Sequence, residues 1–233
     1  MKDLFGKALL DYQNGNYTED IVTSTSISDD DTLPLSYLFR DFKNMPKIEQ
    51  DALKQCKGSV LDVGCGSGSH SLYLQKKDFK VKAIDTSKGA IEVAKKRGVL
   101  NTENLDLLNE TETFDTILLL MNGTGIFQEL SKVSQHLSHL KKRLNPNGQI
   151  LIDSTDIKYM YEDDDGGFWI DSNANYYGEL DYFLTYKNEK ETPMKWLYLN
   201  FKTLKLACET VGLKCELVSE GEHFDFLAKL TSL

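Results

Sequence analysis

The fold is decided by the stretch VLDVGCGSG, residues 60–68. Its first four residues are mostly apolar and include two valines, which is typical of a buried strand. Three alternating glycines follow, and they allow a tight turn and a close approach to a ligand because they carry no Cβ. The residues from Ser69 to Lys77 have helical character. A strand, a glycine-rich turn and a helix N-terminus together present free N–H groups to a bound molecule.

The composition is that of one sizeable α/β domain that needs neither disulfides nor a metal. The chain has 233 residues, of which 40% are hydrophobic, and its mean hydropathy is −0.39. The net charge of −9 argues against a nucleic-acid-binding surface, which would need a basic stripe. The four cysteines form no CxxC pair and have no histidine at zinc-ligand spacing, so reduced thiols and no metal site are expected.

The sequence also bears on location. The N-terminal residues carry two aspartates and no long apolar run, which is unlike a signal peptide. The longest apolar run, from Ile117 to Met121, is too short to span a bilayer. A cytoplasmic protein without a membrane partner is therefore expected.

Strand and helix patterns alternate from Val60 onward, which predicts a parallel sheet with helices on both faces. The last two expected strands are joined by a short turn and must be antiparallel. The prediction is an α/β, doubly wound, seven-stranded sheet, mostly parallel with its last strand antiparallel. The expected strands are 60–63, 79–85, 99–105, 114–121, 149–152, 214–219 and 224–230.

The whole chain is expected to form a single domain with additions to this sheet. A helical cap contains helices at 1–14 and 45–53, separated by a polar stretch through 29–31 that is interpreted as a solvated loop. Two aromatic, strand-like runs at 176–186 and 195–200 predict an inserted β-hairpin. The predicted parts are the N-terminal helical cap (1–56), the core (57–156), the insertion (157–200) and the C-terminal part of the core (201–233).

The glycine spacing distinguishes two kinds of nucleotide site. A dinucleotide fingerprint would place its third glycine at position 69, where this chain has Ser69, and the third glycine is Gly68 instead. The pattern D-x-G-x-G-x-G beginning at Asp62 resembles motif I of the class I S-adenosylmethionine-dependent methyltransferases. The resemblance covers residues 60–152 and, more loosely, 201–230. It implies a Rossmann-like fold and S-adenosyl-L-methionine as the cofactor.

The resemblance assigns the glycine-rich turn to the methionine moiety of that cofactor. The backbone of Gly64, Cys65 and Gly66 would lie along it, and Gly68 would complete the turn. Asp62 would contact the moiety directly or through water. Cys65 is not expected to be a nucleophile, because no base is near it in the sequence.

Further cofactor contacts are implied at the ends of the following strands. Asp85 would accept hydrogen bonds from both ribose hydroxyls, the alternative being an ordinary turn residue. Thr86 would flank the adenine, and Asp106 would read its amino group. Met121 and Asn122 would line the methyl-donor pocket. The alternatives to Asp106 are Asn104 and Asn109.

The aromatic segment 33–40 precedes the sheet and is a candidate cover for the cofactor. Arg40 would pair with the cofactor carboxylate while Tyr37 packs nearby; the alternative is a surface arginine and a core aromatic residue. No Asn/Asp-Pro-Pro-Tyr/Phe tetrapeptide follows the fourth strand, where the chain has Met121 to Thr124. That tetrapeptide would indicate an amino-methyltransferase acting on adenine or glutamine.

The resemblance predicts methyl transfer to an acceptor that the sequence does not identify. The acidic composition and the aromatic insertion favour a small molecule over nucleic acid. A general base is needed only if the acceptor is protonated, and His223 is the candidate for that role. Two other interpretations stay open at this point: a non-catalytic S-adenosylmethionine-binding or interaction protein with the same fold, and a nicotinamide-dependent oxidoreductase, which Ser69 disfavours.

Overall fold

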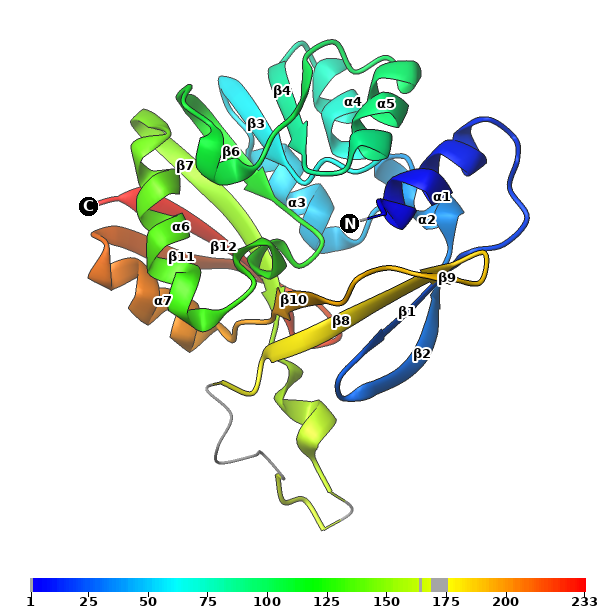
Figure 1. Cartoon of the computed structure of the whole chain (residues 1–233). Helices are drawn as coiled ribbons and strands as arrows, with labels where there is room; N and C mark the ends of the chain where they lie inside the picture. The colour runs from blue at the N-terminus through cyan, green and yellow to red at the C-terminus, as the bar shows by residue number, and fades with distance from the viewer. Residues whose placement is uncertain (1, 164, 169–175) are drawn as a thin grey trace.

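A seven-stranded sheet forms the centre of the molecule. The computed structural model describes residues 2–163, 165–168 and 176–233 (Figure 1). The strand order is β11-β12-β7-β6-β3-β4-β5, and β12 is antiparallel to both of its neighbours. This confirms the predicted sheet. The strands are β3 (Ser59–Val63), β4 (Lys80–Asp85), β5 (Thr102–Asn104), β6 (Phe114–Leu119), β7 (Leu144–Thr155), β11 (Leu213–Glu220) and β12 (Asp225–Ser232).

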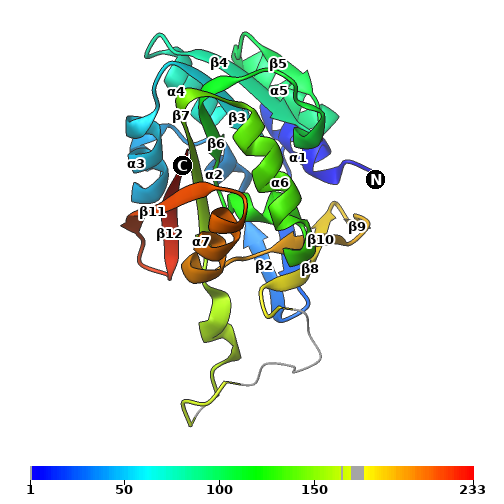
Figure 2. The ribbon, with the colours of Figure 1, turned by 90° about the vertical axis from the view of Figure 1, so that its left-hand side faces the viewer.

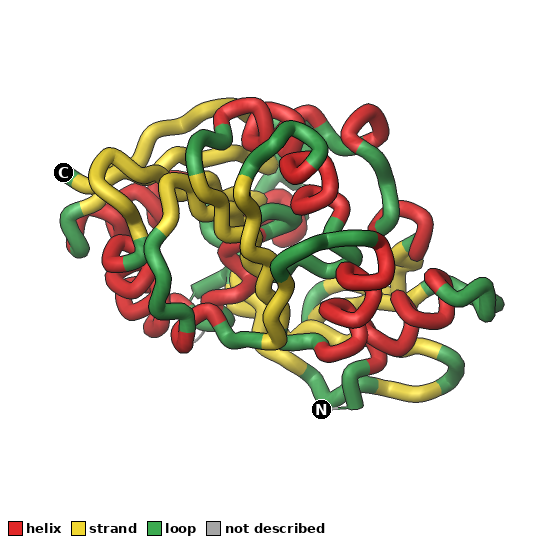
Figure 3. Tube along the Cα trace, turned by 90° about the horizontal axis from the view of Figure 1, so that it is seen from above, coloured by secondary structure: helices red, strands yellow, loops and turns green. Residues whose placement is uncertain are grey.

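Helices cover both faces of this sheet, as Figures 2 and 3 show. Successive strand side chains point to opposite faces, so Val60 packs with α3 and α4 while Leu61 packs with α6 and α7. The buried strands are therefore apolar on both sides, which is why the core pattern was readable in the sequence. The helices are α3 (Lys47–Gln55), α4 (Ser69–Gln75), α5 (Lys88–Arg97), α6 (Leu130–Lys142) and α7 (Phe201–Thr210).

A second, antiparallel sheet lies across the carboxyl ends of β6 and β7 (Figure 1). Its order is β10-β8-β1-β2, with β9 paired to β8. The predicted hairpin is confirmed, because β8 and β10 pair, but β8 also pairs with β1, with Val22 opposite Thr185. The strands are β1 (Ile21–Thr25), β2 (Ser28–Leu33), β8 (Glu179–Tyr186), β9 (Glu189–Lys190) and β10 (Met194–Leu197).

Two local expectations need correction. The polar stretch 29–31 is not a loop but part of β2, so the cap contains a hairpin beside its helices. This edge strand is largely exposed and lacks the apolar alternation that identifies a strand. The sequence NPNG at 145–148 predicts a turn, but these residues form an irregularity within β7, where Asn147 adopts a φ of +63°. Residues 1, 164 and 169–175 of the predicted cap and insertion lie outside the described residues.

The two sheets are in direct contact through the turn that follows β6. This turn is the 3-10 helix η3 (Gly123–Phe127), and it packs against β10. A Cβ placed on Gly125 would lie 2.1 Å from the Trp196 ring, so only a glycine fits there. No helix among the described residues has the length and apolar character needed to cross a membrane.

The cap helix α1 (Leu4–Gln13) crosses α5 at very short range. A Cβ on Gly89 would lie 2.5 Å from the backbone of Gly6, and the Gly89 N–H donates to the Asp3 carboxylate at 2.9 Å. Asp3 also accepts from the Gly6 N–H and so begins α1. The crossing therefore depends on both glycines.

We expect the substitution Gly89→Ala to destabilise the protein by about 1–3 kcal/mol, because the added methyl group forces α1 away from α5. The gain of about 1 kcal/mol in helix propensity is smaller than this steric cost. Urea unfolding measures the difference, with Lys95→Ala on the exposed side of α5 as the control. Equal or higher stability of the Gly89 variant would show that the helices tolerate a wider separation.

Candidate functional site

The glycine-rich turn after β3 has the geometry that its sequence predicts. Gly64, Gly66 and Gly68 have φ values of +70°, +52° and +83°, which residues with a Cβ rarely adopt. The N–H groups of Gly64 and Cys65 donate to the Ile84 carbonyl, which anchors the turn to β4. A Cβ on Gly68 would meet Val99 at 2.8 Å, whereas one on Gly66 would meet nothing closer than 3.9 Å. The outer surface of the turn is therefore open at Gly66.

Asp85 lies at the end of β4 and faces the turn. Its carboxylate accepts from the Gly66 N–H at 2.9 Å and from the Ser87 N–H at 2.8 Å. Burial raises the pKa of Asp85 to about 6, although these two hydrogen bonds act in the opposite direction. A carboxylate offers about four lone-pair sites, so two remain for further donors.

The residues proposed for the adenine end are solvent-exposed. Thr86 follows Asp85, and its carbonyl accepts from the Asn104 side chain at 2.9 Å. Asp106 begins a short 3-10 helix, η2 (Leu107–Asn109), by accepting from the Leu108 N–H at 2.8 Å. The same Asn104 amide also donates to the Asp85 carbonyl, so its donors are already engaged.

The side chains of Asp62, in β3, and Cys65, in the turn itself, are buried. Asp62 is 2% exposed and accepts a 2.5 Å hydrogen bond from the Ser71 hydroxyl of α4. Burial is the main cause that raises the pKa of Cys65, which keeps its thiol protonated. This supports the view that Cys65 is not a nucleophile.

Segment 33–40 lies against the turn, with the short helix α2 (Leu35–Leu38) in its middle. The Ser67 and Ser69 hydroxyls donate to the Leu38 carbonyl at 2.5 and 3.1 Å. Arg97 of α5 donates to the Ser67 carbonyl at 2.8 Å and to the Phe39 carbonyl at 3.3 Å. Hydrogen bonds from the turn, from the start of α4 and from α5 therefore hold segment 33–40 in place.

Arg40 belongs to a buried charged cluster rather than to an open surface. Its guanidinium forms an ion pair with Glu49 of α3, and the other Glu49 oxygen lies 2.7 Å from His70 Nε2. Burial alone would raise the pKa of Glu49, but His70 and Arg40 together hold it below its ordinary value. Arg40 Nε has no hydrogen-bond partner within the described residues. A cofactor carboxylate would therefore share this guanidinium with Glu49.

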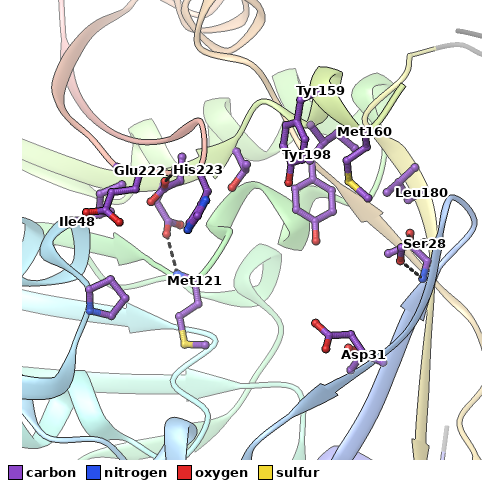
Figure 4. Close-up of a pocket in the computed structure, with 18 of the residues that line it drawn as sticks. Ser28, Asp31, Ile48, Met121, Tyr159, Met160, Leu180, Tyr198, Glu222 and His223 are labelled. Atoms are coloured by element: carbon purple, nitrogen blue, oxygen red, sulfur yellow. Dashed lines mark hydrogen bonds between the residues drawn. The ribbon is translucent and has the colours of Figure 1, made fainter. Parts of the chain in front are cut away.

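Met121 and Asn122 form the turn between β6 and η3. Both have a left-handed backbone, with φ values of +67° and +59°. Asp153, at the end of β7, accepts from the Met121 N–H at 3.0 Å and from the Gly123 N–H at 2.7 Å, and Figure 4 shows the first of these bonds. Asn122 donates to the Leu197 carbonyl at 3.3 Å, which links this turn to β10.

A cavity of about 1090 Å³ lies between this turn and the second sheet (Figure 4). Of the predicted site residues, the cavity is lined by Met121 and His223, whereas Asp62 and Asp85 lie at the glycine-rich turn. His223 is exposed, in the turn between β11 and β12. Other lining residues come from α3, β2, β7, β8 and the segment that joins β10 to α7. They include, in that order, Glu49, Asp31, Asp153, Tyr182 and Tyr198.

Sequence reasoning missed Asp153 as a site residue. Asp153 is 9% exposed, lines the cavity and organises the Met121 turn. Burial raises its pKa to about 6, against the effect of the amide hydrogen bonds. A signal was present, because Asp153 follows a buried strand just as Asp85 does. Glu49 carried no comparable signal, because only tertiary packing brings it to Arg40 and His70.

Comparisons with known proteins agree with this geometry. A family model described as "Methyltransferase domain" matches residues 60–148. A crystal structure of an S-adenosylmethionine-dependent methyltransferase from Bacteroides fragilis, in complex with S-adenosyl-L-homocysteine, is 41% identical to this chain. The match has a TM-score of 0.93 and covers 100% of this chain and 96% of that chain.

More distant relatives share only part of the chain or only the fold. The mitochondrial ubiquinone biosynthesis O-methyltransferase of Saccharomyces cerevisiae is 36% identical over 118 residues, which cover 46% of this chain and 36% of that protein. The chain spans about two fifths of the length of several curated relatives. An amino pentose methyltransferase structure from Micromonospora echinaspora, 14% identical with a TM-score of 0.56, covers 80% of this chain and 88% of that chain and shows the fold alone.

The glycine-rich turn, the strand order and the full-length match at 41% identity together exclude the nicotinamide-dependent alternative. The chain belongs to the class I S-adenosylmethionine-dependent methyltransferases, which are enzymes.

Proposed function

We propose that this enzyme transfers the methyl group of S-adenosylmethionine to a small molecule held in the cavity between the two sheets. The observation that carries the proposal is the position of Met121, which lines this cavity at the end of β6, two strands from Asp85 in the sheet. A volume of about 1090 Å³ is close to the upper end of the roughly 300–1,000 Å³ of ligand pockets. Such a space holds a small molecule together with the reacting end of the cofactor.

The arrangement of the turn supports the cofactor contacts that the family resemblance implies. We propose that the Gly64–Gly66 backbone lies along the methionine moiety and that Asp85 accepts from the ribose hydroxyls. Thr86 and Asp106 would border the adenine, and Met121 the methyl group. The free lone pairs of Asp85 and the open surface at Gly66 support this orientation.

The reaction is an in-line displacement at the methyl carbon. The acceptor lone pair forms the new bond, and the electrons of the C–S bond leave with sulfur as S-adenosylhomocysteine. Holding the two reactants in line contributes roughly 7–11 kcal/mol to such reactions. The Asp153–Met121 hydrogen bond fixes the cavity wall at this point. His223 lines the same cavity and is the proposed base for an acceptor that is protonated.

Cofactor affinity should fall as the pH falls below about 6. Above its pKa of about 6 Asp85 is ionised and accepts from donors through both oxygens, whereas below it the carboxyl is neutral and one acceptor is lost. Calorimetric titration of S-adenosylhomocysteine between pH 5 and pH 8 (about three pH units around this pKa) measures the effect. Asp85→Asn should flatten the profile, and an unchanged slope in that variant would assign the titration to another group.

The small-molecule acceptor can be tested directly with labelled cofactor. Protein is incubated with methyl-tritiated S-adenosylmethionine and a cell extract separated into a low-molecular-weight and a macromolecular fraction. We expect label to enter the low-molecular-weight fraction only. Transfer into nucleic acid or protein would contradict the proposed acceptor class while leaving the methyltransferase activity intact.

A further inference from the structure

The cavity wall carries an unusual excess of negative charge. Carboxylates reach it from separate elements: Asp29 and Asp31 from β2, Asp153 from β7, and Glu220 and Asp225 beside the β11–β12 turn. Asp31 lies on one side of the cavity, and Glu222 and His223 on another (Figure 4). The charges therefore surround the space instead of forming one solvated run.

Most of this charge has no protein cation to balance it. Lys47, which also lines the cavity, forms an ion pair with Asp51 of the same helix at 3.4 Å. Among the described residues, no lysine or arginine forms an ion pair with Asp29, Asp31 or Asp153. Asp153 is the decisive case, because it is 9% exposed and receives only amide hydrogen bonds. Burying a carboxylate without a cation is costly, which favours a ligand that supplies one.

Aromatic rings complete the wall. Tyr37, Tyr159, Tyr182 and Tyr198 line the same cavity. The face of a tyrosine ring attracts cations, and the Arg40 guanidinium already occupies one face of Tyr37, 3.9 Å from the ring centre. Carboxylates combined with aromatic faces are the chemistry that recognises an ammonium group.

We propose that the acceptor is a small molecule bearing an amine, held as its ammonium form by the cavity carboxylates and methylated on nitrogen. This inference rests on the proposed function, because it takes the cavity to be the acceptor site. One ammonium proton passes to the proposed base His223 and from it to water, the nitrogen lone pair forms the N–C bond, and the electrons of the C–S bond leave with sulfur. Methylation thus converts S-adenosylmethionine and an amine into S-adenosylhomocysteine, the N-methyl product and a proton.

The test compares ligands of similar size and scaffold that differ in charge. Three matched sets are titrated into protein loaded with S-adenosylhomocysteine: tyramine, tyrosol and 4-hydroxyphenylacetate; cyclohexylamine, cyclohexanol and cyclohexanecarboxylate; glucosamine, glucose and glucuronate. In at least one set the amine should bind about tenfold more tightly than its neutral and acidic counterparts. The advantage should shrink at high salt, because exposed carboxylates are screened.

The alternation of β2 provides a matched control. Asp29 and Asp31 line the cavity, whereas the intervening Asp30 does not. The double variant Asp29→Asn, Asp31→Asn should reduce the amine advantage at least about threefold, and Asp30→Asn should leave it unchanged.

Equal or tighter binding of a neutral or acidic member in all three sets, or no binding of any amine below about 10 mM, would overturn the inference. Equal effects of the Asp30 variant and the double variant would also overturn it. If S-adenosylhomocysteine itself fails to bind, the proposed function fails; if it binds and the amines show no preference, only this inference fails.

Discussion

Replacing Glu49 with alanine is expected to destabilise the protein by about 3–5 kcal/mol, the largest effect anticipated for a single side chain here. Glu49 is 3% exposed and is the shared partner of Arg40 and His70. Its removal leaves a buried guanidinium without its counter-ion. Burial would lower the pKa of His70, but the hydrogen bond to Glu49 helps to raise it, so the histidine is also affected.

Urea unfolding of the Glu49→Ala variant measures this effect. The matched control is Asp51→Ala on the same helix, whose partners Lys47 and Lys54 are mostly exposed. Exposed ion pairs contribute only about 0–1 kcal/mol, so the control should be nearly neutral. A loss of less than about 1 kcal/mol for Glu49→Ala would show that the buried cluster is not important for folding.

The second large effect is expected at the cofactor. Asp85→Ala should weaken the binding of S-adenosylhomocysteine by more than about tenfold, or about 1.4 kcal/mol. The substitution removes the proposed ribose acceptor and also frees the Gly66 and Ser87 N–H groups that Asp85 holds. The expected loss of affinity therefore has two sources: the missing contact with the ribose and disorder of the turn.

Asp85→Asn helps to separate these two contributions. The amide keeps one oxygen acceptor for the turn but loses the charge and the second acceptor. We expect a smaller loss of affinity than for alanine, measured by calorimetry, with circular dichroism to check that the variant is folded. Unchanged dissociation constants in both variants would show that the ribose assignment is wrong.

The central sheet was predictable because its strands are buried on both faces. Val60 to Val63 (apolar except for Asp62) and Ile117 to Leu119 contact helices on either side, so their sequence alone marks them. The second sheet was not fully predictable. Its β2 edge strand exposes three consecutive aspartates, and β1 pairs with β8 across more than half of the chain. Neither feature leaves a local periodicity.

The strands that carry the predicted site residues were predictable, and the cofactor contacts of these residues stay predictions. Asp62 and Asp85 were singled out by the resemblance to motif I, and the structure places Asp62 within β3 and Asp85 at the end of β4. Arg40 was singled out, but its partners Glu49 and His70 come from two other helices, so only packing defines the cluster. Asp153 has the same strand-end position as Asp85, and the long β7 that presents it was expected to be shorter.

The most direct test of the proposed cofactor site is a calorimetric comparison of three ligands with the full chain: S-adenosylmethionine, S-adenosylhomocysteine and NAD. We predict one binding site for each of the first two, with affinity reduced by Asp85→Ala, and no heat of binding for NAD. Absence of binding for both sulfur-containing ligands, or binding of NAD at the same site, would contradict the account.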